Sequence, residues 1–441
     1  MVTSQTAKPR GEGHMTRFTV AVLAAFSTVG AASAGGLDRS GQSVLAIFDD
    51  PGTLSFGLSH VTPDLTGTDV RGTGSYDAGG SYTQYSFSYS NQINDRFSYA
   101  IIGDQPFGAD IFYNDTPQTS ALGGTKADLS SDAVSFIGKY QLSDRVSVFG
   151  GLRAERAGGT VALNGQAYAQ AISVSSVARG AGVGFATLGA ALQGDPTAVA
   201  AVGGPANAQA LGAQVQALST QFLTPGVGGF TGYDVEIEQS WGVGVTLGAA
   251  YEIPEIALRL AVTYHSEVTH EGDATERFGF TAAGAGAPIP GRIAFQSPQS
   301  VNIDFQTGIN PKTLLLASMR WTDWDDFDVI PTQLGSDLAN IDDSYRWTLG
   351  VARRFSDELV GLASITYEKD NGGATLSPLG PTDGQIGVSV GARYSTGNLD
   401  ISGGINYTKV GSAFAGVGGQ PVASFTDNSA IGVGFKVAYK F

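Results

Sequence analysis

The chain has 441 residues, no cysteine, 62 glycines and a net charge of −15. Beyond the N-terminal region no run reaches 18 apolar residues, which excludes a membrane protein built from helices. The acidic balance and the absence of a basic cluster argue against a nucleic-acid partner. The length is large for one soluble domain but suits a single large β-barrel, in which apolar and polar residues alternate.

The N-terminal region predicts export. Positive charge precedes the apolar run 18–29, and small residues follow that end in an Ala-x-Ala pattern at Ala34. This order is typical of a cleaved signal peptide. We therefore expect residues 1–34 to comprise an upstream extension, 1–14, and a signal peptide, with an N-terminal anchor helix as the alternative.

The first mature segment, 35–52, lacks a period of two and mixes small, apolar and charged residues. Its apolar cluster favours burial, so we expect a hatch that folds back into the barrel lumen, with a disordered tail as the alternative. The candidate hatch residues are Val44, Leu45, Ile47, Phe48, Asp49, Asp50 and Pro51.

Alternating, strand-like runs fill residues 53–441. They lie at 53–66, 81–90, 96–105, 129–141, 146–156, 233–252, 256–265, 299–308, 313–324, 344–355, 359–369, 385–394, 399–410 and 429–441. This gives about fourteen runs, an even number as in bacterial barrels, joined alternately by short turns and long connections. The fold class predicted is therefore all-β, a transmembrane antiparallel barrel in the bacterial outer membrane.

The last run shows the pattern most clearly. From Ile431 to Phe441 every odd position is large and apolar, and every even position is Gly, Ala or Lys. A period of two with an apolar face of this length fits a strand that meets lipid, with an edge strand of a soluble barrel as the alternative. The terminal Phe441 resembles the signal that the barrel-assembly machinery recognises. Outer-membrane lipid and lipopolysaccharide are further expected partners of what we expect to be a monomer.

The segment 157–230 breaks the alternation. It is rich in Ala and Gly, and Leu211, Val215, Leu218 and Phe222 fall at helical spacing. We expect a large extracellular loop with two or three short helices, with a floppy insertion as the alternative.

Alternation places basic and apolar side chains together in the lumen. Candidate ligand-binding residues are Arg153, Arg320, Arg346, Phe149 and Leu316. Guanidinium groups bind anionic head groups by charge-assisted hydrogen bonds, and apolar neighbours would suit a hydrocarbon chain. The alternative is that these basic groups only pair with acidic hatch residues. The four tryptophans, Trp241, Trp321, Trp324 and Trp347, are expected at the membrane interfaces, with single positions in the core as the alternative.

Enzyme and metal chemistry find little support. His265 and His270 are five positions apart on one predicted strand, so they should face opposite sides, which disfavours a metal pair. An outer-membrane lipase, with His265 as its base, remains the enzyme alternative. The acidic cluster 323–328 matches no calcium loop and fits a solvated loop or divalent-bridged contact with lipopolysaccharide. No cofactor and no metal are predicted.

Several stretches together resemble the FadL/TodX family of outer-membrane transporters for long-chain fatty acids and hydrocarbons. They are 93–97, 106–108, 298–327 with its W-T-x-W-x-x-F pattern, 345–347 and the Phe-ended last strand. The resemblance implies fourteen strands, a hatch, capture of a ligand outside the cell and an internal pocket. It also implies sideways exit at a kink in the third strand, where Pro106, Phe107 and Gly108 lie.

Two departures from the family pattern affect the expected ligand. Asp50, Pro51 and Gly52 stand where the family hatch usually has Asn-Pro-Ala, and the loop 325–332 contains no Lys or Arg. We therefore expect a channel for hydrophobic compounds, with long-chain fatty acids as the first candidate. Uncharged aromatic or other hydrocarbons are the alternative, and a purely structural barrel is a third possibility.

Overall fold

The computed structural model describes residues 37–280, 284–339, 341–370 and 375–441. The expected signal peptide and its cleavage site lie outside these ranges. In the part of the chain that is described, no single helix is long and apolar enough to cross a membrane. One pair of helices, 166–181 with 185–192, passes that test jointly but is bent by 111°.

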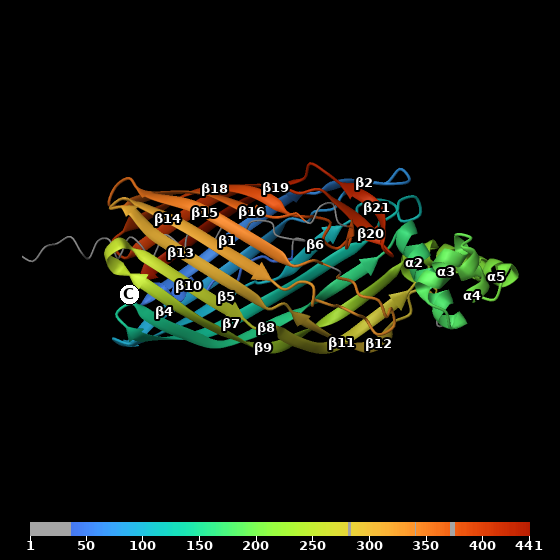
Figure 1. Ribbon diagram of the computed structural model, residues 1–441, viewed down its shortest axis with the longest axis horizontal. Coiled ribbons are helices and arrows are strands. Elements are labelled where there is room, and N and C mark those ends of the chain that lie inside the picture. Colours follow the sequence, from blue (N-terminus) through green and yellow to red (C-terminus); the bar gives the residue numbers. More distant parts are fainter. Residues whose placement is uncertain (1–36, 281–283, 340, 371–374) are drawn as a thin grey trace, which may run out of the picture.

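Fourteen antiparallel strands close into one barrel (Figure 1), as the sequence predicted. In order around the wall they are β1 (Thr53–Asp64), β4 (Tyr82–Asn94), β5 (Phe97–Asp104) with β6 (Gly108–Phe112), β7 (Lys126–Ser143), β8 (Val146–Leu163), β9 (Tyr233–Ile253), β10 (Leu258–His265) with β11 (Val268–Phe278), β12 (Ile289–Ser297) with β13 (Ser300–Asn310), β14 (Thr313–Thr322), β15 (Ser344–Arg354), β16 (Leu359–Glu368), β18 (Gln385–Thr396), β19 (Leu399–Val410) and β22 (Ser429–Lys440). β1 pairs with both β22 and β4, which closes the barrel.

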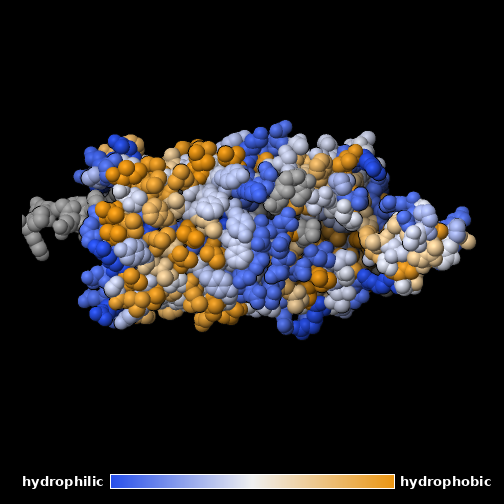
Figure 2. Space-filling model, in the orientation of Figure 1, coloured by the Kyte–Doolittle hydropathy of each residue, from blue (hydrophilic) through white to orange (hydrophobic). Residues whose placement is uncertain are grey.

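The two faces of the wall follow the alternation of the sequence. In β22 the side chains of Ile431, Val433 and Phe435 are exposed, whereas Ala430 and Gly432 are buried. Figure 2 shows apolar residues gathered over the half of the barrel that carries the short turns, with hydrophilic residues at its rim and toward the loop end. This apolar zone is the surface that meets lipid. The role of the exposed Phe441 in assembly stays a prediction.

Short strands and helices cover the loop end of the barrel. A second sheet consists of β2 (Thr66–Asp69), β3 (Ser75–Asp77), β17 (Thr375–Leu376), β20 (Ala413–Val417) and β21 (Gln420–Phe425). The helices are α2 (Gln166–Ala181), α3 (Phe185–Leu192), α4 (Pro196–Ala201) and α5 (Pro205–Leu223), and η3 (Val227–Gly229) follows them. In Figure 1, α3, α4 and α5 project beyond the barrel.

The helical segment differs in two ways from the predicted loop at 157–230. It holds four α-helices rather than two or three, and it begins later, because β8 runs on to Leu163. The extension of β8 stays paired with β7 and β9, so its backbone remains satisfied beyond the membrane zone. Leu211, Val215 and Phe222 are buried on one face of α5, in agreement with their helical spacing.

Interruptions in three strands change which residues face the lumen. In β5 the even positions Ala100 and Ile102 are buried, whereas in β6 the odd positions Ala109 and Ile111 are buried. The break between β10 and β11 has the same effect, because the buried positions are odd in β10 and even in β11. His265 and His270 are therefore both buried, and the prediction that they face opposite sides is wrong.

The N-terminal segment enters the lumen in the half of the barrel with the short turns. Its short helix η2 (Leu45–Phe48) buries Leu45, Ile47 and Phe48. These side chains form one apolar cluster with lumenal residues of the wall, namely Ala100, Ile102, Ile137, Phe149, Ala250, Ala257, Ala261, Leu314, Leu316, Ala352 and Val360. At roughly 1.5–3 kcal/mol for each fully buried large apolar side chain, this contact is sufficient to hold the hatch in place.

Candidate ligand-binding site

The wall is weakest where β5 gives way to β6. β4 pairs with β5 only as far as Phe87 opposite Gly103. Beyond the break, β6 pairs with β7, and its other edge makes one bridge, from Ile111 to Gly79. The break falls at Pro106, which has no N–H to donate to a ladder. Part of the edge of β4 therefore has no backbone partner on this side.

Side chains span this gap in place of the missing ladder. The backbone N–H of Tyr85 donates to Oε1 of Gln105 over 3.0 Å, and Nε2 of Gln84 donates to the Gln105 carbonyl over 3.3 Å. Nε2 of Gln105 in turn donates to Asp132, which also accepts from the Tyr85 hydroxyl and from Arg156. Gln105 thus bridges the two edges of the gap.

The N-terminal arm occupies the lumenal edge of the same break. The N–H of Gly108 donates to the Leu37 carbonyl over 2.9 Å, and the N–H of Arg39 donates to the Pro106 carbonyl over 2.8 Å. Ser131 of β7 holds the other side, because its hydroxyl accepts from the N–H of Phe107 and donates to the Phe107 carbonyl. The kinked backbone is therefore held between the hatch arm and β7.

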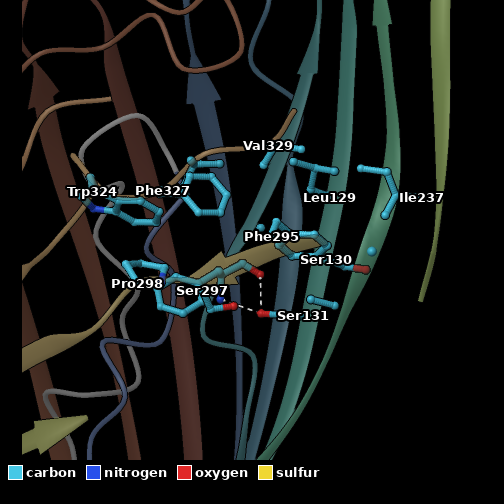
Figure 3. Close-up of a pocket in the computed structure, with 15 residues that line it drawn as sticks. Leu129, Ser130, Ser131, Ile237, Phe295, Ser297, Pro298, Trp324, Phe327 and Val329 are labelled. Carbon is cyan, nitrogen blue, oxygen red and sulfur yellow. Dashed lines mark hydrogen bonds between the residues drawn. The ribbon is translucent and has the colours of Figure 1, made fainter. Parts of the chain in front are cut away.

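An apolar cavity lies against the kink (Figure 3), with about 530 Å³ of space that protein atoms do not fill, including space open to solvent. Figure 3 shows Trp324 and Phe327 on one side and Leu129 and Ile237 on the other. The complete lining is Leu37, Phe107, Gly108, Leu129, Ser130, Ser131, Ala157, Gly158, Ile237, Phe295, Ser297, Pro298, Trp324, Phe327 and Val329. A concave, mostly apolar space with a few polar groups is the usual form of a small-molecule site.

Irregular backbone surrounds this cavity on three sides. Phe107 and Gly108 follow the break in the third strand, and Pro298 lies in the break between β12 and β13. A register shift between β8 and β9 falls at Gly158. Because bulges and breaks redirect the wall and its side chains, they open a space that a regular barrel of alternating residues would fill.

The cavity lining carries no charged side chain. Its polar side-chain groups are three serines and the indole N–H of Trp324. All three serines are engaged: Ser131 bonds to the backbone of the kink, Ser297 donates to Glu155 over 2.5 Å, and Ser130 accepts from Gln239 over 3.5 Å. The rings of Phe107, Trp324 and Phe327 meet edge to face at centroid distances of 5.6 and 5.5 Å. These walls suit a hydrocarbon chain or an aromatic ring.

The three predicted arginines lie in the lumen, each in a buried ion pair. Nε of Arg320 lies 2.6 Å from Asp38 of the hatch, and Arg346 lies 3.6 Å from Asp38 and 3.5 Å from Glu368. Arg153 pairs with Glu155 over 3.1 Å. Burial by itself would raise the pKa of Asp38, but the guanidinium groups of Arg320 and Arg346 outweigh it and hold that pKa below its ordinary value. Arg320 and Arg346 therefore both pair with an acidic residue of the hatch, which is the alternative that the sequence left open.

The predicted apolar candidates fall into two separate groups. Phe107 and Gly108, two of the three residues predicted at the kink, line the cavity. Phe149 and Leu316 instead pack on the hatch, where the ring of Phe48 meets Phe149 edge to face at 5.6 Å. The ring of Phe48 is also covered by Arg259 and Lys139 at 4.3 and 4.8 Å.

Sequence reasoning missed most of the cavity wall. Trp324 was expected at a membrane interface but is 1% exposed and packs on Phe107, so that prediction is wrong. Trp241 and Trp347, by contrast, are exposed on the outer face of the barrel. The spacing of Trp324 and Phe327 after β14 was visible in the sequence, but only the fold of the loop turns both rings inward.

The buried polar cluster beside the cavity does not form a catalytic triad. Ser297 and Glu155 both approach Nε2 of His270, at 3.2 and 3.4 Å, while Nδ1 faces the Ser240 carbonyl. A triad needs the acid at the nitrogen opposite the nucleophile, where it orients the ring. The cluster instead ties β8, β11 and β12 together. Among the described residues, no group of three or more His, Cys, Asp or Glu side chains is arranged to hold a metal ion.

The comparisons with known proteins agree with this geometry. The family model described as outer membrane protein transport protein (OMPP1/FadL/TodX) matches residues 42–441. No curated protein matches the chain. The crystal structure of a Pseudomonas aeruginosa FadL homologue matches with a TM-score of 0.62 and 14% sequence identity. The match covers 90% of this chain and 92% of the homologue's chain.

Two further structures are titled as channels for aromatic compounds. The P. putida toluene transporter TodX has a TM-score of 0.59 at 16% identity, with 90% of this chain and 92% of its own covered. The CymD monoaromatic hydrocarbon channel has a TM-score of 0.54 at 16% identity, with 90% of each chain covered. At these identities the likeness to solved structures shows the fold alone.

Proposed function

The chain belongs to the FadL/TodX family of outer-membrane transport proteins, and we propose that it is a passive channel for hydrophobic compounds, with long-chain fatty acids as its first substrate. The observation that carries this proposal is the apolar cavity against the kink in the third strand. A ligand captured from outside would enter that cavity and leave sideways between β4 and β6. Lateral exit spares an apolar molecule the aqueous periplasm.

The gap between β4 and β6 supports this route. Along it Gln105 replaces a backbone ladder with side-chain hydrogen bonds. Side-chain bonds can break and re-form without unzipping the barrel, whereas separating two laddered strands would leave several backbone groups unpaired in lipid. We further propose that a single barrel performs the transport, without a partner subunit.

An uncharged hydrocarbon is the second candidate substrate. It is favoured by the absence of charge from the cavity lining and by structural neighbours titled as toluene and monoaromatic hydrocarbon channels. The two candidates differ in charge, size and shape, so one uptake experiment with both ligands separates them.

The test is uptake of labelled oleate and labelled toluene by a deletion strain with no other copy of the family. We expect the wild-type gene to restore uptake of at least one compound. Ala157→Phe fills the cavity and should lower that uptake about tenfold, because the ligand loses its space. Ala154→Phe, on the opposite face of the same strand, is the matched control and should leave uptake unchanged. Equal uptake of both compounds with and without the gene would refute the proposal.

A further inference from the structure

Arginines that line the lumen are paired with carboxylates as a rule. Five arginines have a guanidinium nitrogen within 4.0 Å of a carboxylate oxygen, namely Arg153, Arg259, Arg320, Arg346 and Arg393. Arg39 of the hatch arm is different, because it makes no ion pair within that distance among the residues described. Its Nε atom is buried and lacks a hydrogen-bond partner.

The surroundings of Arg39 hold it in place without neutralising it. Its guanidinium lies 4.1 Å from the centre of the Tyr82 ring, and its backbone N–H is bonded to the Pro106 carbonyl. The carboxylates of Asp110 and Asp128 influence it from farther away. Since a buried charge is costly unless it is paired and hydrogen-bonded, this guanidinium is suited to receive an anion.

Gly108 allows the Arg39 side chain to reach this position. A Cβ atom on Gly108 would lie 2.6 Å from Cζ of Arg39, so only glycine lets the guanidinium lie across the kink. Gly108 also lines the apolar cavity. Arg39 lines a second cavity, with about 550 Å³ of unfilled space including space open to solvent, together with Tyr82, Asp110, Thr382, Gln385 and Val410. Gly108 therefore lies between the apolar cavity and a cation that has no ion-pair partner in the described part of the chain.

We propose that Arg39 binds the anionic head group of an amphipathic ligand at the kink, and that this ligand is a monocarboxylate whose chain occupies the apolar cavity. The inference rests on the proposed function, chooses between its two candidate substrates and assigns the head group to a particular residue. A carboxylate matches the two-pronged geometry of a guanidinium. Asp110 on the same cavity wall disfavours a doubly charged group such as a phosphate monoester, because it would repel the second charge.

The test compares two ligands that differ only in charge. Binding of oleate and of oleyl alcohol to the purified protein in nanodiscs is measured for the wild type, Arg39→Gln and Arg39→Lys. Arg39→Gln should weaken oleate binding about tenfold or more, because a charge-assisted bond is lost, and should leave oleyl alcohol binding unchanged. Arg39→Lys should retain part of the preference for oleate.

A second variant tests position rather than charge. Gly108→Ala displaces the guanidinium, which is the flexible end of a side chain, and should also weaken oleate binding selectively. If Arg39→Gln leaves oleate binding unchanged, or weakens both ligands equally, Arg39 is not a head-group site. If the folded wild type binds neither compound, the proposed function itself fails, and this inference fails with it.

Discussion

At the scale of single residues, Asp38 connects the hatch to the barrel. Its carboxylate is 1% exposed and faces Arg320 and Arg346, and Arg320 also bonds to Gln42, Ser300 and Asn302. Asp50, at the other end of the hatch, also forms an ion pair, with Lys440 at 2.8 Å, but both side chains are well exposed. Two carboxylates in one segment thus differ in solvent access.

Replacing Asp38 should free the hatch, and replacing Asp50 should not. Asp38→Asn leaves the buried guanidinium of Arg320 without its anion and leaves Arg346 paired with Glu368 alone, which costs about 3 kcal/mol of hatch docking. Asp50→Asn removes a solvent-exposed pair worth under about 1 kcal/mol. Hydrogen exchange of the amides in 44–48 measures both effects, and equal protection in the two variants would contradict the argument.

At the scale of secondary-structure elements, the breaks in three strands are the features that make the site. Each break reverses the alternation of the strand and turns a new set of side chains inward. The break between β5 and β6 does more, because it also removes the ladder to β4 and leaves Gln105 to span the gap. The gap is closed by side-chain hydrogen bonds around Gln105 rather than by backbone pairing.

Gln105→Ala should open this gap. The amide of Tyr85 loses its acceptor, and its hydrogen exchange should accelerate about tenfold, since roughly 1–1.5 kcal/mol of hydrogen bonding disappears. Gln84→Ala is the matched control, because it removes the neighbouring bond but leaves that of Tyr85 intact. Unchanged exchange at Tyr85 in Gln105→Ala would show that the gap is held by other contacts.

At the scale of the whole molecule, the apolar interior consists of separate clusters. One joins the hatch to the lumen, and a second fills the loop end around the cavity and includes Tyr168 and Phe222 of the helical segment. A third lies entirely within the helices and contains Leu188, Val202 and Leu211. The outer helices thus have a core of their own.

Removing α3 and α4 should therefore leave the barrel intact. α2 and α5 pack side by side, so a short Gly-Ser linker in place of 183–204 can join them. We expect the barrel to retain its heat-modifiable mobility on gels, and its melting temperature to change little, because none of its own contacts is lost. Failure of this shortened chain to fold would show that the outer helices stabilise the barrel.

The sequence by itself determined the barrel. A period of two over many runs makes one face of each strand apolar, and this pattern needs no knowledge of neighbours. It predicted the fourteen strands and the lipid-facing positions of β22. The apolar cluster at 44–48 predicted the buried hatch, and the family resemblance implied the kink at 106–108. Basic residues in the lumen followed from the same alternation.

Only the tertiary structure decided how these groups are used. Whether a lumenal arginine is paired depends on where the hatch lies, so Arg320 is neutralised by Asp38, while Arg39 has no ion-pair partner among the residues that the structure describes. His270 is buried because a break precedes its strand, and Trp324 is buried because its loop folds inward. Neither effect can be predicted from the alternation of residues in the sequence. Periodicity fixes the side of the wall on which a residue lies, but contacts between segments far apart in the chain fix its partner.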